Sequence, residues 1–461
     1  MSTSLVWIVY AGGLAAALAA GWRYGLPGLF LAHVFFVPWF GLQVNLGLTI
    51  NVDRVIAAAL LALTLLRFGP RGLAGWGLFA AYAALDTVAQ SLTLPPDTEL
   101  YSALRGQWRW LFQLPVWGLM IAPGALATAA GNRRLAQSAL DVLVLSAGGL
   151  AILGLVQAAV YLATGADIFP VGVIDPWAVT RTGLIEAERM GGGRMTWIRM
   201  GSLAGEPKHL AYVVMVAATI LLADQIYGGL LTLSRSLKTA VAVVCVVALV
   251  GTFSTQGLVL GSFNVAAMLA TAPKSGRTAL RRYAAVGVAL VLLFVVTAQV
   301  AGLHEVLLER TVGRLRDQGG IEDWNQAVMG FLRETPWVWP FGVGLGNVHL
   351  YAAPYIPLAA ESYMVGQVFV AKSGLLRLLS ELGLAGLGLF LAAYLAQVLR
   401  ALRHRDAEGA RSSVGFAALG MVLLVDFLVS GDGPVSPFLF AGLCTAACRQ
   451  DDVRRPEVLR A

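Results

Sequence analysis

Apolar residues are grouped in long runs along this chain and do not recur with the period of an amphipathic helix or strand. Many of the runs approach the roughly 20 residues that a helix needs to cross a bilayer. Helices are the expected form, because backbone groups in lipid must be hydrogen-bonded within their own segment. We therefore predict an all-α, polytopic integral membrane protein with about 12 to 13 transmembrane helices. The predicted spans are 5–21, 26–42, 53–67, 73–92, 108–128, 136–163, 209–229, 237–252, 255–272, 283–302, 375–399, 413–430 and 435–449.

The amino-acid composition supports the assignment to integral membrane proteins. Of the 461 residues, 58% are hydrophobic and only 13% are charged, whereas soluble proteins carry roughly 25% charged residues. This composition excludes a soluble enzyme, a disordered chain and a secreted disulfide scaffold. The net charge is +7. In a membrane protein such an excess is expected in cytoplasmic loops, so it does not indicate nucleic-acid binding.

The Lys and Arg residues predict the orientation, because they gather in alternate connections between the spans. Short loops rich in these residues face the cytoplasm. The amino terminus is then predicted outside and the carboxyl terminus inside. The residues assigned to the cytoplasm are Arg23, Arg67, Arg71, Arg133, Arg134, Arg235, Lys238, Lys274, Arg277, Arg281, Arg282, Arg400, Arg403, Arg405, Arg411, Arg449, Arg454, Arg455 and Arg460.

Two outer connections are long and polar, and together they hold most of the charge outside the cytoplasmic loops. Long loops are uncommon unless they have a function, so chemistry is expected there. The predicted organisation is amino-terminal helices (1–163), a first long periplasmic loop (164–208), central helices (209–302), a second long periplasmic loop (303–374), and carboxyl-terminal helices with a short tail (375–461).

The first long loop ends in arginines that stand just before a helix. Arginine and the amides of a helix start together make an anion site. This function is favoured for Arg199, whereas Arg181 and Arg189 are expected to pair with acids of the loop or with lipid headgroups. Glu206 precedes the next helix, where it is equally well read as a partner of the helix dipole or as a catalytic residue.

The second long loop contains an amphipathic helix over 322–334, with Trp324, Val328 and Leu332 on one face. The PWVWP sequence ends this helix, and the GVGLGN sequence that follows predicts a tight glycine turn that lets backbone approach closely. We interpret His349 as a turn residue at the water interface in preference to a catalytic base.

Charged residues also stand at the start of the span that follows this loop. Lys372 and Ser373 lie at its mouth, where charge usually faces a cavity or a partner. Arg377 and Glu381 are four residues apart and are predicted to pair along one helix face.

Four segments resemble the O-antigen polymerase and ligase superfamily of bacterial envelope polysaccharide assembly (Wzy-like and WaaL-like proteins). They are RMGSLAGEPKHLAY, FSTQGLVLG, ETPWVWPFGVGLGN and KSGLLRLLSELGLAG. In the second segment Gln256 stands where the family usually has Arg. The last segment fits the ligase motif at Ser373, Gly383 and Gly386, but Lys372 occupies the position of its His. A lysine is protonated at neutral pH and suits a phosphate contact better than a base, which favours a polymerase.

The resemblance implies a GT-C-like glycosyltransferase in the bacterial inner membrane with its active site facing the periplasm. Donor and acceptor would be glycans on undecaprenyl diphosphate, and a chain-length regulator and a flippase are further expected partners, with no nucleic acid. The leaving diphosphate would be stabilised by cations, and no metal or other cofactor is expected. The catalytic candidates are Arg199, Glu206 as general base, and Lys372; the substrate-binding candidates are Arg194, Arg314, Gly344, Gly346, Asn347, His349 and Ser373.

Two alternatives remain open at the level of sequence. A ligase would use the same chemistry to transfer polymer to lipid A core or to protein. A non-enzymatic polysaccharide or lipid transporter would be expected to show internal repeats and charges near the middle of the membrane. This chain instead concentrates its charge in the two long outer loops.

Overall fold

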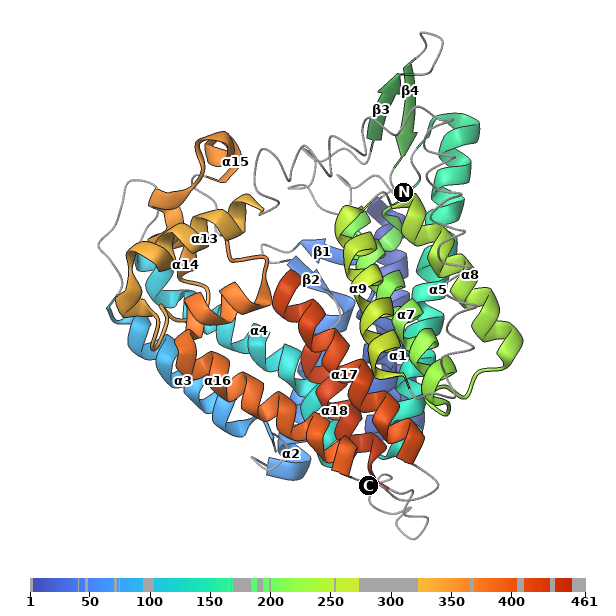
Figure 1. Ribbon diagram of the computed structural model, residues 1–461, viewed down its shortest axis with the longest axis horizontal. Coiled ribbons are helices and arrows are strands. Elements are labelled where there is room, and N and C mark those ends of the chain that lie inside the picture. Colours follow the sequence, from blue (N-terminus) through green and yellow to red (C-terminus); the bar gives the residue numbers. More distant parts are fainter. Residues whose placement is uncertain are drawn as a thin grey trace.

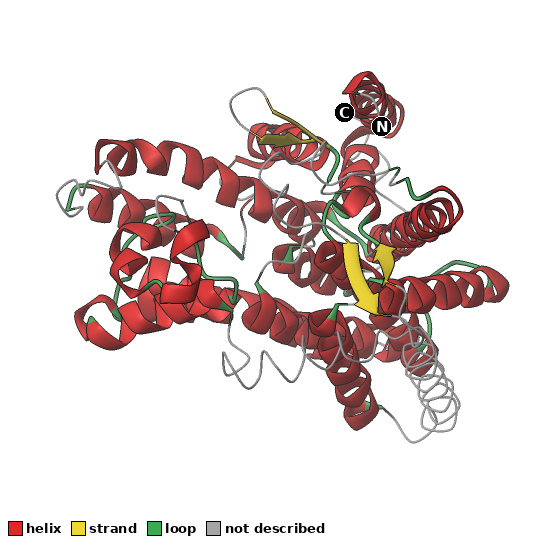
Figure 2. Ribbon diagram, turned by 90° about the horizontal axis from the view of Figure 1, so that it is seen from above, coloured by secondary structure: helices red, strands yellow, loops and turns green. Residues whose placement is uncertain are grey.

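The computed structural model describes residues 3–39, 41–45, 49–69, 73, 75–93, 103–166, 168, 184–188, 194–198, 200–252, 254–272, 322–364, 369–403, 410–431 and 436–449. Within these ranges the regular structure is helical except for two antiparallel hairpins, β1 (Gln43–Asn45) with β2 (Thr49–Asn51) and β3 (Leu184–Glu188) with β4 (Arg194–Ile198) (Figures 1 and 2). The longer helices are α1 (Thr3–Phe36), α2 (Val52–Phe68), α3 (Gly77–Ser91), α4 (Ala103–Ala130), α5 (Arg133–Thr164), α7 (Pro207–Tyr227), α8 (Arg235–Gly251), α9 (Thr255–Thr271), α13 (Asp323–Glu334), α16 (Gly374–Arg403), α17 (Ala410–Ser430) and α18 (Pro437–Ala447).

Five helices in the described part of the chain contain apolar stretches long enough to cross a membrane. These stretches are Gln113–Ala130, Arg133–Thr164, Pro207–Tyr227, Gly374–Arg403 and Arg411–Ser430. The prediction of a helical protein with membrane-spanning segments is confirmed to that extent. The predicted span 283–302 lies outside the described residues.

Helix α1 contains a sharp reversal, where Gly25 has φ 65° and ψ −152°. A Cβ atom added to Gly13 would lie 3.0 Å from the ring of Phe36, and one added to Gly21 would lie 3.5 Å from Leu29. These contacts show that the two halves pack against each other as an antiparallel hairpin. The halves correspond to the predicted spans 5–21 and 26–42, although the second half ends at Phe36, before Pro38.

Helix α16 is also broken, at Gly383 (φ 66°, ψ −170°), where a single span over 375–399 was predicted. The freed backbone groups are satisfied from outside the helix. Leu384 N donates to Trp339 O at 2.7 Å, and Ala385 N donates to Pro340 O at 3.1 Å. The prediction missed this break because nothing in the local apolar run shows that another segment will replace the helix's own hydrogen bonds.

The main core surrounds α7, whose side chains are nearly all buried among α5, α8, α9 and α17. A second layer is formed where α4 and α18 approach so closely that Gly124 lies against the backbone of Phe438. The ring of Phe438 packs on those of Trp76, Phe79 and Phe390. Close approach through glycine is typical of helices packed in membranes.

The second long loop builds a small core of its own, which we call the loop subdomain (residues 322–364 and 369–371). It contains α13, α14 (Val348–Ala352) and α15 (Glu361–Met364), and these lie above α3 and α16 in Figure 1. Val328 and Leu332 are buried in this core, and Trp324 packs against it. The predicted amphipathic helix and its apolar face are therefore confirmed.

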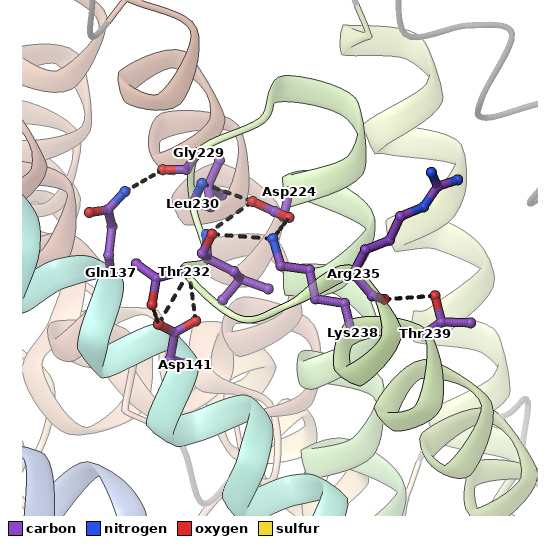
Figure 3. A network of polar contacts seen from close by, with 10 residues as sticks. Gln137, Asp141, Asp224, Gly229, Leu230, Thr232, Arg235, Lys238 and Thr239 are labelled. Carbon is purple, nitrogen blue, oxygen red and sulfur yellow. Dashed lines mark hydrogen bonds and ion pairs between the residues drawn. The ribbon is translucent and has the colours of Figure 1, made fainter.

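The turn between α7 and α8 is fastened by two buried carboxylates (Figure 3). Asp224 accepts hydrogen bonds from Leu230 N and Leu231 N, each at 2.9 Å, and pairs with Lys238 Nζ at 2.7 Å. Asp141 of α5 accepts from both the backbone N–H and the hydroxyl of Thr232. The turn is thus tied to the bundle at both ends.

Candidate functional site

Three helix ends meet at the place where α9 begins, α17 ends and α16 begins. Gln256 Nε2 donates to Ser430 Oγ at 2.8 Å, and Ser373 Oγ donates to Leu428 O at 2.7 Å. Gly431 lies directly against the backbone of Lys372, so a side chain there would collide with it. The FSTQG and KSG segments are far apart in sequence, and both contact the last turn of α17.

The interruption between α8 and α9 positions Gln256. Helix α8 ends at Gly251 and α9 begins at Thr255, as the predicted division between 252 and 255 requires. Ser254 caps the new helix, because its Oγ accepts from Gly257 N at 3.3 Å. A Cβ atom added to Gly257 would lie 2.7 Å from that of Ala211, so the start of α9 packs against the beginning of α7.

The segment before α7, residues 200–206, is held rigidly by a residue that sequence reasoning missed. Gln157 of α5 is buried, and its Oε1 accepts from Gly201 N at 3.1 Å and from Ser202 N at 2.9 Å. Ser202 has φ 52°, a left-handed conformation that is strained for a residue other than glycine. Its buried hydroxyl has no hydrogen-bond partner among the described residues. A lone Gln inside an apolar span is the sequence signal that identifies Gln157.

Glu206 is the residue immediately before α7. Its backbone oxygen accepts from His209 N and Leu210 N, but its side chain makes no capping hydrogen bond. The carboxylate instead lies 3.4 Å from Lys208 Nζ, and both side chains are about a quarter exposed or less, at 25% and 20%. The position suits interaction with the helix dipole. The carboxylate therefore lies at the beginning of α7, the end of that helix against which the start of α9 packs.

Lys372 lies where the loop subdomain joins α16. Asn325 Oδ1 of α13 accepts from Lys372 N at 2.8 Å and from Ser373 N at 3.1 Å. Lys372 Nζ lies 5.7 Å from the centre of the Trp324 ring, which places the ammonium over an aromatic face. Asn325 was also missed, and its only sequence signal is its polar position next to Trp324 in the amphipathic helix.

The glycine segment GVGLGN folds as the tight turn that was predicted. Gly344 and Gly346 have φ 82° and 79°, values that favour glycine. Gly344 N donates to Glu381 O at 2.8 Å, and Gly346 N donates to Glu381 Oε1 at 3.0 Å. The other carboxylate oxygen, Oε2, accepts from Arg377 Nε at 3.2 Å, which confirms the predicted pairing. Glu381 is completely buried, and it joins the glycine turn to the first half of α16.

Helices α3 and α4 cover this turn with further polar groups. Leu345 N donates to Thr87 Oγ1 at 3.1 Å, and a Cβ atom on Gly346 would lie 2.6 Å from Gln113. The guanidinium of Arg377 lies 5.2 Å from the centre of the Trp117 ring. Glycine at 346 is therefore required by close packing as well as by its backbone conformation.

Two predicted binding residues of this region are buried. Asn347 is wholly buried, and its side-chain N–H donates to Val343 O at 3.0 Å. His349 is only 3% exposed inside α14, so it is not the water-exposed turn residue that we inferred from sequence. The cause is the packing of α14 on the loop subdomain's core through Val348 and Ala352. Burial also raises the pKa of the Tyr351 phenol, two residues further along α14.

Of the three candidate arginines in the two long loops, the structure describes only Arg194. Arg199 and Arg314 lie outside the described residues. Arg194 begins β4, where the hairpin register sets it opposite Glu188. Among the residues that the structure describes, no group of three or more His, Cys, Asp or Glu could hold a metal ion.

The structure thus brings the 200–206 segment, Gln256, Lys372 and Ser373 to connected helix ends, with the glycine turn further along α16. No protein-family model matches the chain, and a search of curated proteins finds no significant match.

Proposed function

We propose that this chain is a membrane glycosyltransferase that polymerises undecaprenyl-diphosphate-linked oligosaccharide repeat units into O-antigen or exopolysaccharide. The observation that carries the proposal is the meeting of the FSTQG and KSG segments at the end of α17. The 200–206 segment stands at the start of the adjoining helix α7. These are the motif-bearing segments on which the resemblance to polysaccharide polymerases and ligases rests.

The proposed reaction forms one glycosidic bond and breaks one bond to phosphate. The acceptor hydroxyl attacks the anomeric carbon of the donor sugar, and the diphosphate leaves with the bonding electron pair. Arg199, with Arg194, Arg314 and Lys372, would stabilise the charge that develops on the diphosphate. Glu206 would take the proton of the acceptor hydroxyl as general base.

The remaining candidate residues would shape the sugar site. The Trp324 ring, which packs on Phe369, holds the Lys372 ammonium over its face and would fix that cation where it meets the phosphate. Ser373, Gly344, Gly346, Asn347 and His349 are all buried, so they would support the site that receives the repeat units from beneath.

Transport is the second candidate function, because α16 is broken at Gly383. Broken helices whose freed backbone groups face a cavity are a feature of secondary transporters. In this protein the freed N–H groups of Leu384 and Ala385 are already bonded to Trp339 and Pro340. The break therefore supports a fixed docking site for the loop subdomain better than it supports an ion site.

The enzymatic proposal is tested with purified protein in lipid vesicles. Lipid-linked repeat units extracted from the source cells are added, and glycan length and released undecaprenyl diphosphate are measured. The expected result is a ladder of polymer lengths, with one molecule of undecaprenyl diphosphate released for each glycosidic bond formed. Movement of the lipid-linked units across the vesicle membrane with no new glycosidic bond would overturn the enzyme in favour of a transporter. Transfer only to added lipid A core would favour a ligase.

We also propose 12 to 13 crossings in the inner membrane with both long loops in the periplasm, because Lys and Arg alternate between the connections. Single cysteines placed in 164–208 or 303–374 should react with an impermeant thiol reagent added outside. Cysteines in 273–282 or 400–411 should not. Outside labelling of 400–411 would reverse the orientation.

A further inference from the structure

Three large aromatic side chains point outward from the short segment between α13 and α14. Trp337, Trp339 and Phe341 are 68%, 42% and 57% exposed, whereas Val338 between them is 1% exposed and lies in the core of the loop subdomain. We call these three side chains the aromatic ledge. Large apolar side chains that are exposed together on one short segment are unusual, and an exposed apolar patch usually marks an interaction surface.

The ledge is tied by its backbone to the break in α16. The oxygens of Trp339 and Pro340 accept the first N–H groups of the helix that continues from Leu384 to Arg403. That second half has about 20 residues and is therefore ~30 Å long, the thickness of the hydrocarbon layer. Its far end carries Arg400 and Arg403, which suit the opposite water boundary. The ledge therefore lies at the level where this helix enters the bilayer.

Exposed leucines also lie on α16 and on or just after α3. Leu384 of α16 is 53% exposed, Leu85 of the adjoining α3 is 73% exposed, and Leu92, just after the end of α3, is 80% exposed. The two helices are in contact, since Tyr82 OH donates to Leu382 O at 2.9 Å. An exposed leucine face on a helix beside a membrane span is expected to face lipid.

The chemistry of the ledge fits the headgroup region better than the hydrocarbon centre. Tryptophan rings are enriched at the boundary between membrane and water. The indole N–H of Trp339 already donates to Leu332 O at 2.8 Å, so its ring enters an apolar layer without leaving a donor unbonded. Arg333 and Glu334, both exposed at the end of α13, keep the adjoining surface polar.

We propose that the aromatic ledge inserts into the phospholipid headgroup region on the side of the membrane where the second half of α16 begins, and holds the loop subdomain at the bilayer surface. The contact is separate from the proposed glycosyl transfer, and it requires only that the second half of α16 crosses the membrane. Because α13 of the same subdomain binds Lys372 and Ser373 through Asn325, the ledge also sets the height of that contact above the lipid.

The test places an environment-sensitive fluorophore at the ledge and at a matched position away from it. Phe341→Cys carries the probe at the ledge. Leu358→Cys is the control, because Leu358 is 85% exposed on the same subdomain, in the segment just before α15. The wild-type chain, treated in parallel, gives the background from its own cysteines. Each protein is reconstituted in phosphatidylcholine–phosphatidylglycerol vesicles.

Nitroxide groups placed near the headgroup or deep in the acyl chain report the depth of each probe, and aqueous iodide reports its exposure to water. The probe at 341 should be quenched at least about fivefold more by the shallow nitroxide than by iodide, and the probe at 358 should show the reverse. Equal iodide quenching at both positions would overturn the proposal. Strongest quenching of the 341 probe by the deep nitroxide would also overturn it, because the segment would then lie in the hydrocarbon.

Discussion

The two ends of α7 both carry charged residues, but they use them differently. At the turn between α7 and α8, Asp224 accepts two backbone N–H groups and pairs with Lys238 (Figure 3). At the other end, the segment before α7 contains the strained Ser202 with a buried hydroxyl that has no partner among the described residues. Fully satisfied polar groups indicate a structural fastening, whereas strain and unmatched polar atoms concentrate at functional sites. The comparison predicts that mutations at the two ends separate stability from activity.

The largest effect is expected at the α7–α8 turn. Asp224→Ala leaves Lys238 as an unpaired, largely buried cation and frees two backbone donors, so it should cost about 3–5 kcal/mol of folding stability. The change is measured by thermal unfolding in detergent, with the loss of monodisperse protein as the signal. Arg235→Ala is the matched control, because its guanidinium is directed away from the cluster in Figure 3 and should change stability by less than about 0.5 kcal/mol. Equal behaviour of the two variants would remove the distinction between the two ends.

Arg199→Ala should have the next largest effect, on activity alone. Loss of one cation that stabilises the departing diphosphate should lower the rate about a hundred- to a thousandfold. The protein should remain in the membrane while single repeat units accumulate on the lipid carrier. Arg199→Lys should rescue poorly, because lysine keeps the charge but loses the two parallel hydrogen bonds. Arg181→Ala is the control, and near-normal polymer from well-expressed Arg199→Ala would contradict the assignment.

Lys372 tests whether the junction with α16 holds phosphate or moves a proton. Lys372→Ala should lower polymerisation by up to about a hundredfold, whereas Lys372→Arg should keep roughly ten times more activity than alanine. Arginine retains both the charge and the interaction with the Trp324 ring. Arg403→Ala, at the other end of α16, controls for loss of a cation from the same helix. If arginine is no better than alanine, the phosphate role is wrong, because arginine stays protonated.

The smallest effect is expected at Ser202. Ser202→Gly should stabilise the protein by about 1 kcal/mol, since glycine adopts a positive φ without steric cost. Ser202→Ala removes the same hydroxyl but keeps the strain, so it should not stabilise. Melting temperatures of the three proteins in one detergent separate the two causes. Equal stabilisation by both substitutions would show that the unpartnered hydroxyl, and not the backbone, carries the cost.

The sequence was sufficient for features that depend on local pattern. Long apolar runs predicted the helices, because an uninterrupted apolar segment in lipid must satisfy its own backbone. The period of Trp324, Val328 and Leu332 predicted α13, and the spacing of Arg377 and Glu381 predicted their ion pair. The functional roles of Arg199, Glu206 and Lys372 remain predictions that rest on resemblance.

Only the tertiary structure decided which distant segments meet. Asn325 binds the backbone of Lys372 and Ser373 across 47 and 48 residues, and Gln256 binds Ser430 across 174. The break in α16 likewise depends on Trp339 and Pro340, which supply the acceptors that two of the helix's own N–H groups would otherwise lack. The burial of His349 follows from α14 packing on the loop subdomain. Local periodicity contains no information about such contacts, because each is made by groups whose partners are chosen when the whole chain packs.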